Sequence, residues 1–283
     1  FTEKQGNKVG RLAPGGRWDE FSVPTQDSRP QGIAAGPDGN LWFTENCGNR
    51  IGRVTPSGVI TEFPLPTPGS YPFGITSGPD GALWFTLSGT NRIGRITVDG
   101  QVSEFALART QTPYGIATGP DGNLWFTGFN SNTIGRITPE GRVAEFPLPT
   151  LDSAPQGIAA GPDGGLWFTE VAADAVGRIT TDGKVTEFPL PSNPPGSASE
   201  RGRPSRCPST KSPYAIAAGK DALWVTQHCG GRLSRVALDG HVTEIGLDGL
   251  RAPNGAVVAP DGTVWFAVAR SNGIGRQRPE GQQ

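Results

Sequence analysis

Short apolar or alternating segments, separated by turn residues, run along the whole chain. Residues 32–35 are small and apolar, and residues 41–44, Leu-Trp-Phe-Thr, are of the type that favours β-strands. Residues 51–54 form a third apolar segment, and residues 59–63 alternate apolar and polar side chains like a half-buried strand. The tripeptides Pro-Asp-Gly and Pro-Ser-Gly lie between these segments. Because proline presets φ and glycine accepts a positive φ, the pattern predicts tight turns between four antiparallel strands.

This unit is repeated through the sequence. The segment at residues 32–45 returns, in whole or nearly so, at residues 74–86, 115–127, 157–170, 215–227 and 255–267. Its tryptophans recur at intervals of 42, 41, 42, 57 and 41 residues, at Trp42, Trp84, Trp125, Trp167, Trp224 and Trp265. A period near 40 residues with four strands per unit predicts a β-propeller. An open solenoid of this period usually carries helices, and a β-sandwich has no reason to repeat its sequence.

The repeats predict seven blades of four-stranded antiparallel sheet, with the first and last blades incomplete. Residues 1–24 supply only the second half of a unit, five complete units follow, and the last unit stops after residues 274–276. We expect all 283 residues to form a single all-β propeller domain. The strands missing from the two ends are consecutive in the repeat, so we expect a native segment to precede Phe1 and supply them.

Composition and charge argue against several classes of partner and cofactor. The formal net charge is −1, which gives no electrostatic reason to expect nucleic acid or an anionic membrane as partner. No apolar run approaches the ~18 residues that a transmembrane helix requires. Zinc-ligand spacing, a Gly-Lys-Ser phosphate loop and a Gly-x-Ser-x-Gly elbow are all absent from the sequence. We therefore expect a monomer without nucleic-acid or membrane partners, without a metal site and without a cofactor.

One irregular loop, residues 192–213, interrupts the repeat before the sixth blade and carries Cys207. The other cysteines, Cys47 and Cys229, occupy equivalent positions in the second and sixth blades, so we expect that they do not meet. Cys207 enters the sixth blade on the face that holds Cys229, so we predict a Cys207–Cys229 disulfide that leaves Cys47 free. A disulfide of this kind predicts a secreted or extracytoplasmic protein.

Loops alternate between the two faces of an up-and-down blade. The crossing into each inner strand therefore shares a face with the loop after Leu-Trp-Phe-Thr, and these loops vary in sequence while the opposite turns are uniform. Our ligand-binding candidates are the residues at the starts of the inner strands and at the ends of the second strands: Gln31, Phe73, Tyr114, Gln156, Tyr214, Asn254, Glu45, Glu170, Gln227 and His228. Two interpretations remain open, a pocket with stacking aromatics and amide donors, or side chains that only plug the channel mouth.

The charged candidates also have two interpretations each. Glu3, Glu45 and Glu170 could bind a hard cation, but they belong to the first, second and fifth blades, so Glu170 lies well round the ring and we expect solvated carboxylates. His228 could be catalytic or incidental, because the other histidine, His241, lies in the opposite set of turns. The arginine of the repeated Ile-Gly-Arg segment recurs in nearly every blade, and we interpret it as a structural link between blades.

The units at residues 113–127, 132–138 and 145–150 read PYGIATGPDGNLWFT, NTIGRIT and EFPLPT. They closely resemble the streptogramin B lyase (virginiamycin B lyase) family, and the resemblance covers the whole chain. It implies a seven-bladed propeller. It also implies an activity, the opening of a cyclic depsipeptide antibiotic by elimination at its ester bond, with Mg²⁺ and a general-base histidine.

The family motifs that carry this chemistry are altered here. Tyr214 replaces a histidine in the first motif, Ala252 and Asn254 replace a glutamate and the general-base histidine in the second, and Ala269 replaces a glutamate in the third. Proton abstraction beside a carbonyl needs a base, which neither Asn nor Ala supplies. We therefore expect a propeller that binds a small molecule, peptide or partner at the channel mouth without lyase activity. The alternative is an enzyme, a lyase or hydrolase, with a relocated active site on the same face; Mg²⁺ is expected only if lyase-like activity is retained.

Overall fold

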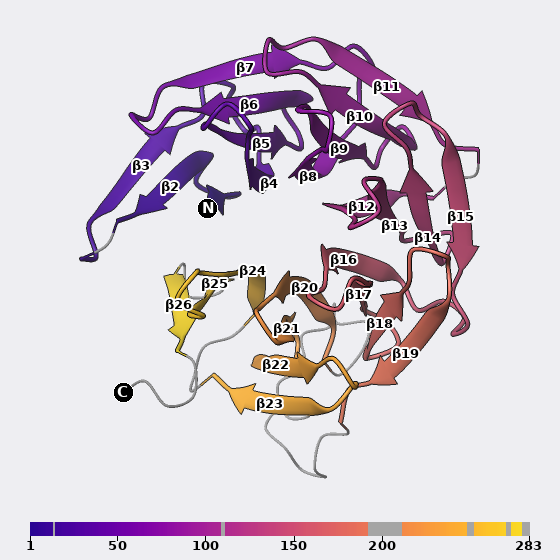
Figure 1. The fold of residues 1–283 in the computed structure, drawn as a ribbon. Coiled ribbons are helices and arrows are strands. Elements are labelled where there is room, and N and C mark those ends of the chain that lie inside the picture. Colours follow the sequence, from indigo (N-terminus) through magenta and orange to yellow (C-terminus); the bar gives the residue numbers. More distant parts are fainter. Residues whose placement is uncertain (14, 109–110, 192–210, 248–251, 270–272, 279–283) are drawn as a thin grey trace. The chain divides into compact units, whose positions relative to one another are not determined.

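The computed structural model describes residues 1–13, 15–108, 111–191, 211–247, 252–269 and 273–278. These residues form 26 β-strands and no helix, arranged in seven antiparallel sheets (Figure 1). The described part of the chain accordingly contains no helix that is long and apolar enough to cross a membrane. The prediction of an all-β, seven-bladed propeller is confirmed, with three strands each in the first and last blades.

The first three blades contain strands in chain order. The first has β1 (Thr2–Glu3), β2 (Lys8–Leu12) and β3 (Trp18–Ser22). The second has β4 (Pro30–Ala35), β5 (Leu41–Glu45), β6 (Arg50–Val54) and β7 (Ile60–Pro64). The third has β8 (Pro72–Ser77), β9 (Leu83–Leu87), β10 (Arg92–Ile96) and β11 (Val102–Ala106).

The remaining four blades repeat this order. The fourth has β12 (Pro113–Thr118), β13 (Leu124–Gly128), β14 (Thr133–Ile137) and β15 (Val143–Pro147). The fifth has β16 (Pro155–Ala160), β17 (Leu166–Glu170), β18 (Ala175–Ile179) and β19 (Val185–Pro189). The sixth has β20 (Pro213–Ala218), β21 (Ala222–Gln227), β22 (Arg232–Ala237) and β23 (Val242–Gly246). The seventh has β24 (Pro253–Val258), β25 (Val264–Val268) and β26 (Gly273–Gln277).

The structure divides into two compact units, and each is described by itself below. The first unit consists of Phe1–Thr118, Gly122–Ser131 and Gly135–Glu145. The second consists of Gly119–Asp121, Asn132–Ile134 and Phe146–Gln283. The boundary runs through the fourth blade, so the first three blades belong to the first unit and the last three to the second. That all 283 residues form one domain stays a prediction.

The second strand of each blade supplies the core, as blade three shows. Trp84 is fully buried and stacks on Phe105 of the outer strand, with ring centroids 5.3 Å apart. Its indole Nε1 donates to Oδ1 of Asp80 at 3.0 Å, and Arg95 Nε donates to the other carboxylate oxygen at 2.6 Å. The aspartate of the Pro-Asp-Gly turn therefore joins the second and third strands of its blade. This charge-assisted pairing explains why the tripeptide recurs with the tryptophan.

In the first two blades the repeated arginine links one blade to the next, as predicted. Arg11 Nη1 of the first blade donates to the Pro56 carbonyl of the second at 2.7 Å. Arg53 Nη1 of the second blade donates to the Val98 carbonyl of the third at 3.1 Å. In both cases the acceptor is a backbone carbonyl in the turn before the neighbouring outer strand. These bonds satisfy turn carbonyls and hold adjacent blades together.

The glycine of Ile-Gly-Arg is required by the phenylalanine of the strand beside it. Gly94 pairs with Phe85, and a Cβ added to Gly94 would lie 2.0 Å from a Phe85 ring carbon. The sixth blade has Val225 at the phenylalanine position, and its partner there is Ser234 rather than glycine. The two positions therefore change together within this one chain, because a smaller side chain on β21 leaves room for one on β22.

The threonine of Leu-Trp-Phe-Thr fixes the starts of the inner strands. Thr44 Oγ1 accepts from the Gly32 N–H at 2.9 Å and donates to the Phe73 carbonyl, in the next blade, at 2.7 Å. Thr86 makes the corresponding bond to the Tyr114 carbonyl at 2.8 Å. A repeated core hydroxyl therefore positions the backbone of the residues that the sequence marks as ligand-binding candidates.

Candidate ligand-binding site

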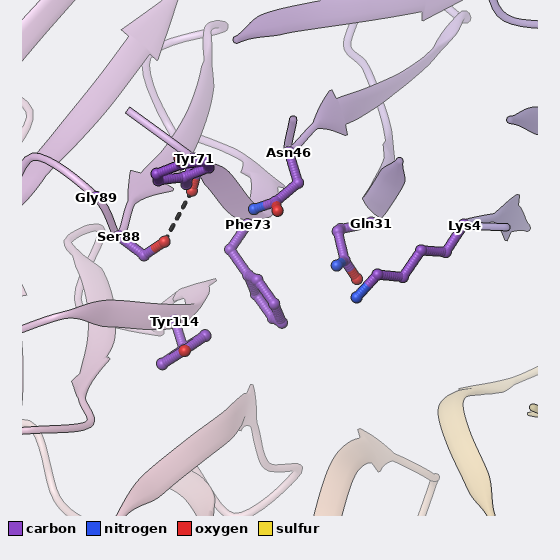
Figure 2. Close-up of a pocket in the computed structure, with 8 residues that line it drawn as sticks. All are labelled: Lys4, Gln31, Asn46, Tyr71, Phe73, Ser88, Gly89 and Tyr114. Atoms are coloured by element: carbon purple, nitrogen blue, oxygen red, sulfur yellow. Dashed lines mark hydrogen bonds between the residues drawn. The ribbon is translucent and has the colours of Figure 1, made fainter. Parts of the chain in front are cut away.

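An open pocket of about 360 Å³ lies in the first unit (Figure 2). Its lining residues are Lys4, Gln31, Asn46, Tyr71, Phe73, Ser88, Gly89 and Tyr114. Three of the predicted candidates, Gln31, Phe73 and Tyr114, are therefore brought together. This volume falls within the range of small-molecule sites.

Two sets of loops build this pocket. Gln31, Phe73 and Tyr114 lie at the starts of the inner strands β4, β8 and β12. Lys4, Asn46, Ser88 and Gly89 follow the ends of β1, β5 and β9. Backbone hydrogen bonds join the two sets, as where the Gly89 N–H donates to the Ser70 carbonyl at 3.0 Å. The prediction that these two loop sets share a face is therefore confirmed in this unit.

Aromatic rings form one side of the pocket. Phe73 and Tyr114 meet edge to face, with centroids 4.7 Å apart and an interplanar angle of 89°. The Phe129 ring also contacts Tyr114, with ring centroids 5.1 Å apart. Edge-to-face contact is a favoured arrangement of aromatic pairs, so the two rings hold each other in place. Tyr71 adds a third ring that is half exposed.

Polar groups complete the lining. Asn46 Nδ2 donates to the Pro72 carbonyl at 3.1 Å, and Ser88 Oγ donates to the Tyr71 carbonyl at 2.8 Å, so both side chains hold the crossing loop (Figure 2). The amide of Gln31 and the ammonium of Lys4 lie across the pocket from Tyr114 (Figure 2). An amide both donates and accepts, and an ammonium donates. The pocket therefore offers rings on one side and hydrogen-bonding groups on the other.

The sequence did not mark Lys4, Asn46, Tyr71, Ser88 or Gly89 as candidates. The available signal was their place in the variable loops of the predicted functional face. Which loop side chains reach the pocket depends on backbone conformations that sequence patterns do not specify. Tyr71, for example, adopts a φ of 46°, which is uncommon for a residue other than glycine.

A second group of candidates comes together in the second unit. His228, just after β21, has its Nδ1 2.6 Å from Oδ1 of Asn254 on β24. The Tyr214 ring of β20 lies beside the imidazole, with ring centroids 5.8 Å apart. All three side chains are partly exposed. Gln156 of β16, also predicted, is largely buried.

The altered family positions lie next to this group. The Ala269 N–H donates to the Ala252 carbonyl at 3.1 Å, and Asn254 is two residues further along. Their side chains offer no carboxylate or imidazole, and no three His, Cys, Asp or Glu side chains in the described ranges are grouped to hold a metal ion. Magnesium prefers carboxylate oxygens. The residues at these positions therefore do not fit a Mg²⁺ site.

The expectation that Glu45 and Glu170 are solvated is wrong. Both side chains are fully buried, each beside a serine and a second glutamate: Ser28 and Glu62 for Glu45, and Ser153 and Glu187 for Glu170. The loop that follows β5 covers Glu45 so closely that a Cβ on Gly48 would lie 2.9 Å from its Oε2. Each carboxyl group therefore sits inside its blade, and neither lines the pocket of the first unit.

Burial changes the protonation of these two carboxyl groups. It raises the pKa of Glu45 to about 8, with a further contribution from the charge of Glu62 on the outer strand. Burial likewise raises the pKa of Glu170 to about 8, and the neighbouring Glu187 also raises it. Both groups are therefore protonated in the folded protein at neutral pH.

In the sixth blade a glutamine occupies the position that Glu45 and Glu170 hold in the second and fifth blades. Gln227, another predicted ligand-binding residue, is fully buried, and its Nε2 donates to Ser234 Oγ at 2.6 Å and to Glu244 Oε1 at 2.8 Å. The buried Lys211 ammonium pairs with the same glutamate. The neutral amide of Gln227 thus replaces the buried glutamate of the second and fifth blades, while the Lys211 ammonium balances the charge of Glu244, so Gln227 has a structural role.

Two of the three cysteines, Cys47 and Cys229, lie within the described residues. Cys47 is free and exposed. Cys207 lies outside the described residues, so its pairing with Cys229 stays a prediction. The Cys229 N–H donates to the Lys211 carbonyl at 3.1 Å, which places the described end of the insert beside Cys229.

Comparison with known proteins agrees with the propeller fold and identifies the family. The family model of virginiamycin B lyase matches residues 1–198, and the chain belongs to this family. A search of curated proteins gave no match. Among solved structures, a streptogramin B lyase is 38% identical with a TM-score of 0.88, over 98% of this chain and 88% of that one.

Two structures from Staphylococcus aureus are similar to the same degree. The virginiamycin B lyase is 38% identical with a TM-score of 0.87, over 97% of this chain and 89% of that one. A catalytically inactive histidine-to-alanine variant of that enzyme, solved with quinupristin, is 37% identical with a TM-score of 0.87 over the same shares.

Proposed function

We propose that this member of the virginiamycin B lyase family binds a small molecule or peptide that carries an aromatic group and backbone-like amides, and that it does not open the streptogramin B ring. The observation that carries the proposal is the pocket of the first unit, where the edge-to-face pair Phe73 and Tyr114 faces the Gln31 amide. Quinupristin bound to the Staphylococcus aureus relative supports a ligand of related chemistry.

The lining groups match such a ligand one by one. An aromatic substituent of the ligand packs on the exposed faces of Phe73 and Tyr71, which removes apolar surface from water. A ligand amide or ester carbonyl accepts from the Gln31 amide or the Lys4 ammonium. These few polar groups orient the ligand, while the rings supply most of the contact area.

Loss of elimination follows from the altered family positions in the second unit. Asn254 supplies no base where the resemblance implies a histidine, and Ala252 and Ala269 supply no carboxylate for Mg²⁺. General-base catalysis is typically worth ~10²–10⁴ in rate. In the Staphylococcus aureus relative a single histidine-to-alanine substitution gives a catalytically inactive enzyme, and this chain lacks both histidines of the family motifs.

Binding to the pocket can be measured by titration calorimetry with quinupristin as the probe. Phe73→Ala is expected to weaken binding by about tenfold or more, because a buried aromatic contact contributes about 1.5–3 kcal/mol. Gln31→Ala tests the polar side without removing core volume. Val59→Ala is the control, since Val59 is 61% exposed and outside the pocket lining. No binding to the unaltered protein, or equal losses in Phe73→Ala and Val59→Ala, would contradict the proposal.

We also propose a Cys207–Cys229 disulfide that holds the insert of residues 192–213, in a protein that acts outside the cytoplasm. The bond between the backbone of Cys229 and Lys211 supports it. Titration of the unfolded, unreduced protein is expected to find one thiol, that of Cys47. Three reactive thiols would exclude the bridge and remove the argument for secretion.

A further inference from the structure

In the second unit, a side chain from the neighbouring blade holds the imidazole of His228. Its Nδ1 lies 2.6 Å from Oδ1 of Asn254, and an amide oxygen can only accept a hydrogen bond. With the amide in this orientation Nδ1 carries the hydrogen, and in the neutral ring Nε2 keeps its lone pair. We propose that His228 is the general base of a second site in this protein, with Asn254 as its positioning residue, and that the site takes small esters that carry an aromatic group.

The backbone on both sides of this pair is fixed. The His228 N–H donates to the Ser212 carbonyl at 3.1 Å. The Asn254 carbonyl accepts from Thr226 Oγ1 at 2.7 Å, the same bond that fixes the inner strands of the other blades. The imidazole is therefore oriented before any ligand binds, which is what a base needs in order to act without reorganisation.

Tyr214 adds an aromatic ring beside the imidazole of His228. Its ring is tilted by 37° from the imidazole, and its backbone carbonyl accepts from Thr169 Oγ1 at 3.0 Å. The partly exposed ring forms a wall beside the base, on which an aromatic group of a ligand can pack. This wall is the reason for assigning an aromatic group to the substrate.

The chemistry is hydrolysis with water as the nucleophile. Nε2 of His228 takes a proton from water as the water oxygen bonds to the ester carbonyl carbon. The carbonyl re-forms, the bond to the alcohol oxygen breaks, and the proton passes from Nε2 to the departing alkoxide. Nδ1–H stays hydrogen-bonded to Asn254 throughout, which stabilises the imidazolium that forms. The step needs neither a metal nor a second protein nucleophile, and it is independent of the pocket in the first unit.

The second histidine of the protein, His241, serves as an internal control for His228. His241 is the other histidine of the sequence, and it lies in an exposed turn where its backbone N–H donates to Asp239 Oδ1 at 2.9 Å. An incidental surface histidine should behave like His241, whereas a positioned base should not.

Imidazole ¹H–¹⁵N correlation spectra test the positioning. In the unaltered protein we expect neutral His228 to carry its hydrogen on Nδ1. Asn254→Asp keeps an acceptor and is expected to keep this tautomer, while Asn254→Ala is expected to lose it. A hydrogen on Nε2 of His228 in the unaltered protein would mean that the Asn254 amide donates to Nδ1, and would overturn the proposal.

Hydrolysis of the activated ester p-nitrophenyl acetate tests the base. His228→Ala is expected to lower the rate by about 10²-fold. Asn254→Ala is expected to lower it by on the order of tenfold through misplacement of the ring, and Asn254→Asp to restore it. His241→Ala should leave the rate unchanged. Equal rates for the unaltered protein, His228→Ala and His241→Ala would overturn the assignment.

Discussion

Gly94→Ser is expected to destabilise the protein by about 3 kcal/mol, and adding Phe85→Val is expected to recover much of that loss. The added side chain would collide with the Phe85 ring, whose nearest carbon is 2.0 Å from the position of a Cβ. Overpacking of a close-packed core typically costs ~1–3 kcal/mol. The double variant reproduces the pair Val225 and Ser234 that the sixth blade already uses.

Urea unfolding followed by tryptophan fluorescence measures this as a double-mutant cycle. Contacting residues of this kind couple by ~0.5–3 kcal/mol. Gly246→Ser is the matched control, because Gly246 is also in a strand and a Cβ there meets nothing within 4 Å. The packing explanation would be contradicted by a Gly94→Ser variant as stable as Gly246→Ser. It would equally be contradicted by a double variant no more stable than Gly94→Ser.

The free energy of unfolding is expected to fall as the pH rises from about 4.5 to about 8, and then to level off. In the unfolded chain Glu45 and Glu170 ionise near their ordinary pKa of 4.5, whereas the folded protein keeps both protonated up to a pKa of about 8. Between these values only the unfolded state has released the protons, so stability is lost as the pH increases. At about 1.4 kcal/mol per pKa unit, each group contributes on the order of 5 kcal/mol.

Glu45→Gln combined with Glu170→Gln is expected to flatten this decline. Glutamine is neutral at every pH, and the sixth blade already carries Gln227 at the equivalent position. At pH 9 the double variant should therefore be more stable than the unaltered protein, while at pH 4.5 the two should be similar. Glu140→Gln alters an exposed carboxylate and should keep the original slope. Parallel curves for the unaltered protein and the double variant would contradict the account of buried neutral carboxyl groups.

The repeats made the fold predictable to the level of blade and strand. Each unit carries its own turn tripeptide, its buried second strand and its alternating outer strand, so local propensity and global topology agree. The same phase places Gln31, Phe73 and Tyr114 at the starts of inner strands, and the structure brings them into one pocket. Their positions follow from the backbone and not from the details of side-chain packing.

Burial at the ends of the second strands could not be read from the sequence. Glu45 looks like a solvated residue before a polar loop, and only the path of that loop over its carboxyl group buries it. The contact between His228 and Asn254 joins residues 26 positions apart in neighbouring blades. Such contacts depend on side-chain rotamers and loop conformations, which the repeat pattern does not specify.

Incubation of the purified protein with quinupristin, with and without Mg²⁺, tests the proposed function most directly when the mass of the product is followed. Restoring the family residues with Tyr214→His, Ala252→Glu, Asn254→His and Ala269→Glu provides the comparison. We predict that the unaltered protein binds the compound and leaves its ring intact in both conditions, and that Mg²⁺-dependent opening is seen only with the restored variant. Efficient Mg²⁺-dependent opening by the unaltered protein would contradict the proposal.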